Sequence, residues 1–308
     1  MARRATVEST KDEFEGQPSL LRSLPRRPLE EAEEGSVFVG AGDSYAAALC
    51  AFFMSPRRVQ AFDPYSLSQS LDWARGRTVY IVSASGATKT NVELAKALKG
   101  VARRIVAVTC NPSSPLAREA DEVVAMPFKP LPKSPGIFSF TLSLLTILRL
   151  SGAHAACDFA RAASSAKLLA KKVSISRRGT TYIVANNEAY AASVYGAAKI
   201  YELLGRRAQA ALTEEFSHMQ LFSLAASDAV NIATSSNEPK GMRLREALED
   251  NGFSCSLLEL PGPRIERLFT LVFTLQLAAI EDAAARGLVH PYFLSARRKL
   301  RVSDRMIY

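Results

Sequence analysis

Residues 78–100 read TVYIVSASGATKTNVELAKALKG, a strand, a turn and a helix in direct succession. The first five residues form a short apolar run, which is typical of a buried strand. The segment from Thr88 onwards has helical periodicity and ends at Gly100, a common stop signal for a helix. A strand that leads straight into a helix is the repeating unit of a parallel α/β sheet. This stretch therefore predicts that fold class.

The rest of the N-terminal half alternates strands and helices in the same way. We expect strands at residues 36–42, 104–111 and 122–128, and helices at residues 43–54, 138–150 and 155–172. This alternation predicts a flavodoxin-like, doubly wound parallel sheet with helices on both faces.

The same order of segments returns in the C-terminal half. Four stretches match in order, with Tyr45 aligned to Tyr190 and Ile81 to Ile232. Look-alike strands occur by chance in any α/β protein, but four matches in one order favour an internal duplication. We place the seam near residues 174–179.

The two copies differ in their chemistry. The turn at residues 83–88 is rich in hydroxyl groups, whereas its counterpart, TSSNEPK at residues 234–240, lacks the glycine and carries Glu238. A glutamate at that place would repel an anion. We therefore expect the N-terminal copy to bind an anion and the C-terminal copy to do other work.

The hydroxyl-rich turn is suited to a phosphate group. It precedes a helix, whose first N–H groups and dipole attract anions. Ser83, Ser85 and Thr88 add hydroxyl donors, Gly86 allows a close backbone approach, and Ser44 follows the first strand in a similar turn. No GxxxxGK[ST] motif is present, which favours a monophosphate over a nucleotide. Taken alone, such a turn is more often an ordinary N-cap.

Composition limits the other classes of function. The chain has 308 residues, is 48% hydrophobic and carries a formal charge of +9. Its basic residues are scattered in pairs without a zinc finger or an aromatic stripe, so we expect no nucleic-acid partner. Four cysteines without CxxC spacing predict reduced core thiols and no metal site. We see no signal peptide and no membrane span, and expect a cytoplasmic location.

The order and spacing of several motifs resemble the sugar isomerase (SIS) superfamily. The match is best to the double-SIS group that includes the isomerase domain of glucosamine-6-phosphate synthase and stand-alone phosphosugar isomerases and deaminases. The stretches that carry the resemblance are DEFEGQPSLLRSL (12–24), GAGDSYAAAL (40–49), the SASGAT turn, CNPSSPLAREAD (110–121), GAAKIYELL (196–204) and EEFSHMQ (214–220).

The resemblance implies two tandem SIS domains, at residues 35–173 and 174–289. An N-terminal helix and lead-in (1–34) precedes them and a basic C-terminal tail (290–308) follows. It also implies a homodimer, because the histidine loop of such proteins often enters the active site of a neighbouring subunit. No metal or organic cofactor is implied, and we expect no glutaminase domain beside the isomerase part.

The resemblance further assigns roles to three residues of the second half. His218 resembles the acid–base that opens the sugar ring, and Glu202 the base that moves a proton between C1 and C2 through a cis-enediol. Lys199 resembles the cation that stabilises the developing oxyanion. From spacing alone, Lys199 and Glu202 would be a surface ion pair on one helix face. The phosphate would be held by Ser44, Ser83, Ser85, Gly86 and Thr88.

Some positions depart from the family pattern. Ala84 and Ala87 replace a glutamine and a glutamate of the usual SQSGET turn. Ala296 aligns with the lysine that forms a Schiff base in the synthase, with Lys299 three residues later. Ser134 and Lys299 are the candidate contacts for the sugar.

Isomerisation needs no imine, so these departures favour it. We expect an aldose–ketose isomerase acting on hexose 6-phosphates. A glucosamine-6-phosphate deaminase and a non-catalytic sugar-phosphate sensor remain as alternatives.

Overall fold

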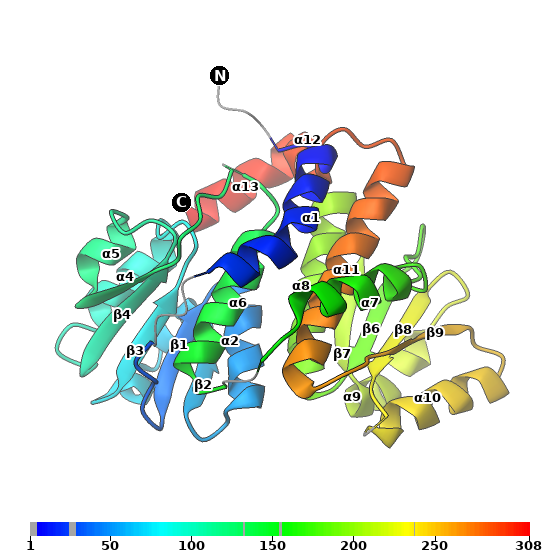
Figure 1. Cartoon of the computed structure of the whole chain (residues 1–308), viewed down its shortest axis with the longest axis horizontal. Coiled ribbons are helices and arrows are strands. Elements are labelled where there is room, and N and C mark those ends of the chain that lie inside the picture. The colour runs from blue at the N-terminus through cyan, green and yellow to red at the C-terminus, as the bar shows by residue number, and fades with distance from the viewer. Residues whose placement is uncertain (1–4, 25–28, 132, 154–155, 237) are drawn as a thin grey trace. The chain divides into compact units, whose positions relative to one another are not determined.

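The computed structural model describes residues 5–24, 29–131, 133–153, 156–236 and 238–308. The chain divides into two compact units (Figure 1). Of the described residues, those within 23–154 and 296–308 form unit 1. Those within 5–22 and 155–295 form unit 2. Each unit is built around its own parallel sheet.

Unit 1 contains a five-stranded parallel sheet in the order β2-β1-β3-β4-β5 within the described residues. The strands are β1 (Ser36–Gly40), β2 (Val59–Phe62), β3 (Thr78–Val82), β4 (Arg104–Thr109) and β5 (Glu122–Ala125). The parallel α/β sheet expected from the sequence is confirmed. Strand β2, at one edge, was not predicted.

Helices flank both faces of this sheet. Alternate residues of β1 and β3 pack with Leu94 and Leu98 in one core cluster, and the residues between them point to the other face, where Phe38 stacks on Tyr80 at 4.6 Å. The helices of the unit are α2 (Asp43–Met54), α3 (Pro64–Ser68), α4 (Lys89–Ala97), α5 (Pro115–Glu119), α6 (Phe138–Leu150) and α13 (Arg297–Ile307), with a 3₁₀ turn at Leu71–Ala74.

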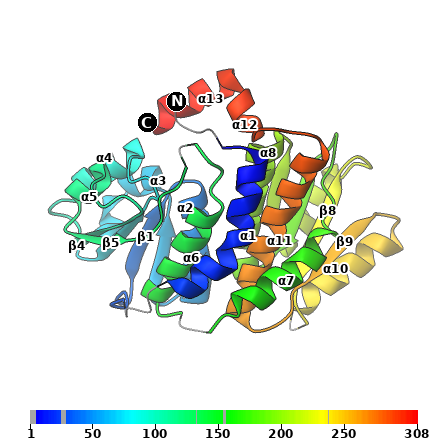
Figure 2. The same ribbon diagram turned by 45° about the horizontal axis from the view of Figure 1, so that its top comes forward.

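Unit 2 contains a four-stranded parallel sheet in the order β7-β6-β8-β9 in the part of the chain described. The strands are β6 (Thr181–Ala185), β7 (Ala208–Leu212), β8 (Ala229–Thr234) and β9 (Cys255–Glu259). The helices are α1 (Val7–Ser23), α7 (Phe159–Ala170), α8 (Asn187–Leu204), α9 (Thr213–His218), α10 (Pro239–Asp250), α11 (Arg264–Ala285) and α12 (Tyr292–Ser295), with a 3₁₀ turn at Gln220–Ser223. Figures 1 and 2 both show α1 beside α11.

The two sheets share one strand order. Strands β6, β7, β8 and β9 take the places that β1, β2, β3 and β4 take in unit 1. The turn after the first strand also repeats a detail, because Gly42 has φ 57° and Asn187, at the aligned position, has φ 52°. Glycine and asparagine are the residues that best tolerate this left-handed conformation. The alignment of the two halves therefore corresponds to a shared backbone course.

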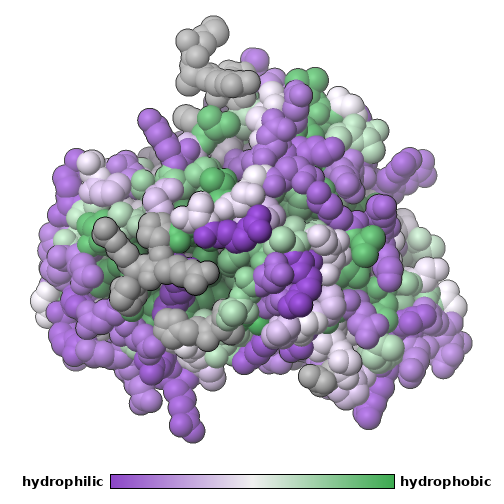
Figure 3. Space-filling model, viewed as in Figure 1, coloured by the Kyte–Doolittle hydropathy of each residue, from purple (hydrophilic) through white to green (hydrophobic). Residues whose placement is uncertain are grey.

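Helix α11 has the length and hydropathy of a membrane span, but 78% of its most apolar window is buried inside the protein. That degree of burial is typical of a core helix. Figure 3 shows hydrophilic side chains dispersed over the face in view rather than gathered into one stripe.

The cysteines only partly follow the expectation of four core thiols. Cys50 is buried, while Cys110, Cys157 and Cys255 are half-buried. Burial raises the pKa of Cys110 to about 11 and that of Cys157 to about 12. Both groups are therefore protonated near neutral pH and are poor nucleophiles.

Candidate functional site

The two predicted phosphate-binding turns of unit 1 start side by side. Gly40, the last residue of β1, pairs with Val82, the last residue of β3. The chain leaves β1 towards β2 on one side, and the later strands lie on the other side. In open parallel sheets, ligands bind at the carboxyl ends of the strands where the strand order reverses in this way. Sequence and topology thus indicate the same edge of the sheet.

Gly86 fixes the shape of the turn between β3 and α4. Its N–H donates to Ser83 Oγ at 3.1 Å, and its carbonyl accepts from the N–H of Leu116 at 3.0 Å. Its φ is 63°, and a Cβ at this position would lie 2.1 Å from Ser114 Oγ. Only glycine fits both the conformation and the space.

The three hydroxyl groups of this turn have different surroundings. Ser83 is 4% exposed, and its Oγ lies 3.4 Å from Thr88 Oγ1. Ser85 is exposed, and its Oγ accepts from the N–H of Ala87 at 3.2 Å. The Thr88 side chain makes no capping hydrogen bond to α4. Ser83 therefore braces the turn, whereas Ser85 and the start of α4 are accessible to a ligand.

Ser44 lies in the first turn of α2 and is half-buried. The helix start packs closely on the end of β1, since a Cβ on Gly40 would lie 2.5 Å from the Ser44 carbonyl carbon. Gly42 precedes α2 and provides no side-chain cap. Both helices at this edge thus begin without a side-chain cap on their first N–H groups, as the phosphate hypothesis requires.

The candidate sugar contacts, Ser134 and Lys299, lie on two other segments of unit 1. Ser134 belongs to a loop that touches the start of α2, because a Cβ on Gly136 would lie 2.4 Å from Asp43 Oδ2. Lys133 Nζ pairs with Asp304 Oδ2 of α13 at 2.7 Å. That helix also carries Lys299, which is exposed.

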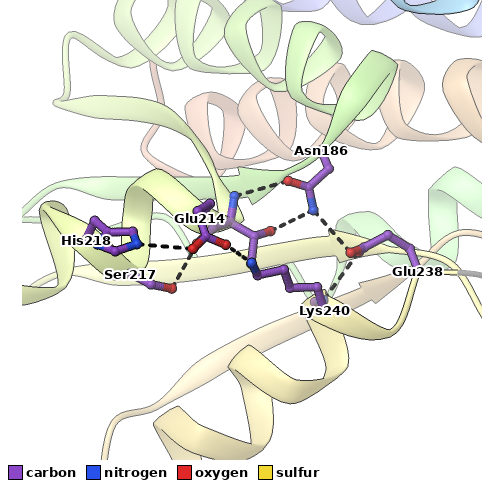
Figure 4. A network of polar contacts seen from close by, with 8 residues as sticks. Asn186, Glu214, Ser217, His218, Glu238 and Lys240 are labelled. Atoms are coloured by element: carbon purple, nitrogen blue, oxygen red, sulfur yellow. Dashed lines mark hydrogen bonds and ion pairs between the residues drawn. The ribbon is translucent and has the colours of Figure 1, made fainter.

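In unit 2 the corresponding turn holds a carboxylate of its own (Figure 4). Glu238 Oε2 accepts from Thr234 Oγ1 at 2.7 Å and from the N–H of Gly241 at 3.3 Å. Glu238 Oε1 accepts from Asn186 Nδ2 at 3.2 Å. The carboxylate thus uses donors that an anionic ligand would need, which accords with the expected difference between the copies.

A pocket of about 220 Å³ lies beside this turn of unit 2. Its walls include the first turn of α8, Glu238, and the side chains of Arg264 and Arg267 from the start of α11. The guanidinium of Arg264 binds the Glu188 carboxylate through two hydrogen bonds of 2.8 and 2.7 Å. No local sequence pattern indicates this pocket, because its walls come from segments spread over residues 186 to 268.

Lys199 and Glu202 form an ion pair on α8. Lys199 Nζ lies 2.6 Å from Glu202 Oε2, and the side chains are 0% and 34% exposed. The ammonium also lies 4.9 Å from the ring centroid of Tyr195. Because the Lys199 side chain is fully buried, the two residues are not a surface ion pair. Burying an ammonium is unfavourable unless partners compensate for the lost water, and such residues often serve function.

His218 ends α9 in a different environment. Its side chain is 70% exposed, and Nε2 lies 3.1 Å from Glu214 Oε1. Figure 4 shows Glu214 between His218 and Lys240, with which it also forms an ion pair. The described contacts of the imidazole do not include Glu202. Sequence reasoning missed Glu214, although its position four residues before the histidine places both on one helix face.

Among the residues that the structure describes, no group of three or more His, Cys, Asp and Glu side chains could hold a metal ion. The candidate residues carry hydroxyls, two ammonium groups, carboxylates and an imidazole. This set is suited to anion binding and proton transfer.

Comparison with known proteins locates the family signal in unit 1. Residues 33–150 match the SIS domain family. The matched segment contains β1 to β5 and both hydroxyl-bearing turns. No curated protein matches the chain in sequence.

Solved structures extend the similarity to almost the whole chain. Glucosamine-6-phosphate deaminase from Thermotoga maritima has a TM-score of 0.72 at 18% identity, covering 92% of this chain and 95% of its own. The C-terminal domain of glucosamine-fructose-6-phosphate aminotransferase from Francisella tularensis has a TM-score of 0.72 at 17% identity. The match covers 92% of this chain and 98% of that domain. Tagatose-6-phosphate ketose/aldose isomerase from Escherichia coli has a TM-score of 0.70 at 15% identity. The match covers 93% of this chain and 97% of the isomerase. These similarities establish the fold.

Proposed function

We propose that this protein is a phosphosugar isomerase that interconverts the aldose and ketose forms of a hexose 6-phosphate. The observation that carries the proposal is the buried Lys199 paired with Glu202. A turn that binds phosphate would serve a sensor equally well, but a sensor has no need of an ammonium removed from water. Proton transfer next to a developing oxyanion does need one.

The phosphate group would be held by the SIS domain. Ser85, Thr88 and Ser44 supply hydroxyl donors at the starts of α4 and α2, and Gly86 gives the backbone room to approach. Ser83 would act mainly by holding the turn. The dianion would gain from helix starts that have no side-chain cap and from the dipoles of the two helices.

The chemical steps would use the residues of unit 2. His218, exposed on α9, would protonate the ring oxygen and accept the proton of the anomeric hydroxyl. Glu202 would remove the proton from one carbon and return it to the other through a cis-enediol. Lys199 would stabilise the oxygen on which negative charge develops. The proposal requires these residues to meet the phosphate-bound substrate, within one chain or across subunits.

The assembly is part of the same proposal. We assign a second SIS domain to unit 2, on the support of the shared strand order and the matched left-handed positions Gly42 and Asn187. The protein would be a cytoplasmic homodimer without metal or organic cofactor, nucleic acid or membrane partner. A dimer would allow the exposed His218 to serve a neighbouring subunit.

A substrate panel tests the proposed activity. Fructose, glucose, mannose and glucosamine 6-phosphates are each incubated with the protein, and conversion and ammonia release are measured. Isomerisation without ammonia supports the proposal, and ammonia from glucosamine 6-phosphate identifies the deaminase alternative. If the protein binds a sugar phosphate but converts none of the four compounds, the sensor alternative is correct.

A further inference from the structure

We infer that Gln17, Gln276 and Tyr195 form a buried positioning network that holds the Lys199–Glu202 pair in place. This inference rests on the proposed function, in which that pair performs the proton transfer. The network joins α1, α11 and α8 of unit 2 and gives a role to the Gln-Pro step of the N-terminal helix, which the proposed mechanism does not use.

The network begins at a proline inside α1. Pro18 has no N–H, so the carbonyl of Phe14, four residues earlier, lacks its usual helical donor. The side chain of Gln17 reaches back towards this carbonyl, with Nε2 3.5 Å from Phe14 O. The same amide donates to Gln276 Oε1 at 2.8 Å. Gln17 thus compensates for the proline while linking α1 to α11.

The next link crosses from α11 to α8. Gln276 Nε2 donates to Tyr195 Oη at 2.8 Å. Both side chains are fully buried, as is Gln17. Water cannot replace these hydrogen bonds, and an unsatisfied buried amide costs about 1–3 kcal/mol. The position of the Tyr195 hydroxyl is therefore strongly fixed.

The last link reaches the proposed reaction centre. Tyr195 precedes Lys199 by four residues, which places both on one face of α8. Its ring lies 4.9 Å from Lys199 Nζ, within the range of a cation–π interaction. The ammonium thus has the ring on one side and Glu202 Oε2 at 2.6 Å. Tyr195 acts through Lys199 and is a positioning residue.

Four variants test this network. Tyr195→Leu removes the ring, Tyr195→Phe keeps the ring and removes the hydroxyl, and Gln276→Leu breaks both amide links. Thr274→Val is the matched control on α11, since Thr274 is equally buried and its hydroxyl donates to Thr270 O of its own helix. Each folded variant is assayed for kcat and KM well below its unfolding temperature.

The expected result is a graded loss of kcat. Tyr195→Leu should lower kcat roughly tenfold, as expected for loss of a desolvated cation–π contact. Tyr195→Phe and Gln276→Leu should lower it about two- to fivefold, and Thr274→Val less than twofold. KM should change less than about twofold, because the phosphate-binding residues are untouched. A kcat within twofold of wild type for folded Tyr195→Leu and Gln276→Leu would overturn the inference.

A second readout does not depend on turnover. Lys199 is fully buried, so a short pulse of acetic anhydride should label it slowly relative to exposed Lys89, as measured by mass spectrometry of peptides. Labelling of Lys199 should rise several-fold in Tyr195→Leu and Gln276→Leu but not in Thr274→Val. Unchanged labelling in both contradicts the network.

Glu202→Gln distinguishes a failure of the proposed function from a failure of the positioning network. If this variant keeps full turnover, the proposed function fails, while the labelling result still tests the network. If it loses turnover but Tyr195→Leu does not, only the positioning inference fails.

Discussion

Gly86 shows how a single residue sets the geometry of the turn between β3 and α4. Its left-handed φ and its contact with Ser114 both follow from the absence of a Cβ. The sequence indicated that a glycine was needed for close approach. It could not indicate that the close neighbour is Ser114, because that contact depends on how the segment after β4 folds back.

Gly86→Ala should destabilise the protein by about 3 kcal/mol, the sum of left-handed strain and steric overlap. It should also abolish binding of inorganic phosphate. Gly100→Ala is the control, since Gly100 has φ 78° but nothing within 4 Å, so it bears the strain alone at about 1–2 kcal/mol. Chemical denaturation measures both. Equal losses of stability for the two variants would show that the packing against Ser114 is unimportant.

Ser85→Ala should raise KM for the sugar phosphate several-fold and leave stability unchanged, because Ser85 is exposed. Ser83→Ala should lower stability by up to about 1 kcal/mol, because it removes the Ser83 Oγ acceptor of the Gly86 N–H and leaves only the Ser83 carbonyl. Steady-state kinetics and thermal unfolding distinguish the two effects. An unchanged KM for Ser85→Ala would argue against a phosphate contact there.

At the scale of elements, sequence patterns located the long, strongly patterned segments best. The helices expected at residues 43–54 and 138–150 are α2 and α6 with the same ends. The helix expected at 155–172 is shorter, because Asp158 caps α7 by accepting from the N–H groups of Ala160 and Arg161. Strands β2 and β7 were missed. Strand β2, VQAF, is only four residues long, and β7, AQAAL, is rich in alanine, which has little preference for strands.

Glu238→Ala tests the role of the carboxylate in unit 2. The variant removes the cap of α10 and should cost about 1 kcal/mol of stability. It should also free Thr234 and Asn186 for an external anion, so calorimetry with inorganic phosphate should detect a second, weaker site per chain. Glu238→Gln, which keeps an acceptor oxygen, should be less destabilised. An unchanged stoichiometry in Glu238→Ala would mean that the carboxylate does not block an anion.

At the scale of the whole molecule, the sequence predicted the α/β class and two parallel sheets, both of which the structure contains. The candidate site was only partly predictable. The hydroxyl turn and the Lys199–Glu202 pair are local patterns. The contact between Gln17 and Gln276 joins residues 259 positions apart, and no local pattern indicates it. The ion pair of Glu214 with Lys240 likewise depends on the fold, whereas Glu214 and His218 are four residues apart on one helix.

The central claim is that Glu202 moves a proton between two carbons of a bound sugar phosphate. Proton NMR of a converted hexose 6-phosphate in deuterated water tests it most directly, because an enediol exchanges its proton with solvent. Wild-type protein should introduce deuterium at C1 or C2, and Glu202→Gln should introduce none while still binding inorganic phosphate with unchanged affinity. Exchange by Glu202→Gln at the wild-type rate would contradict the claim.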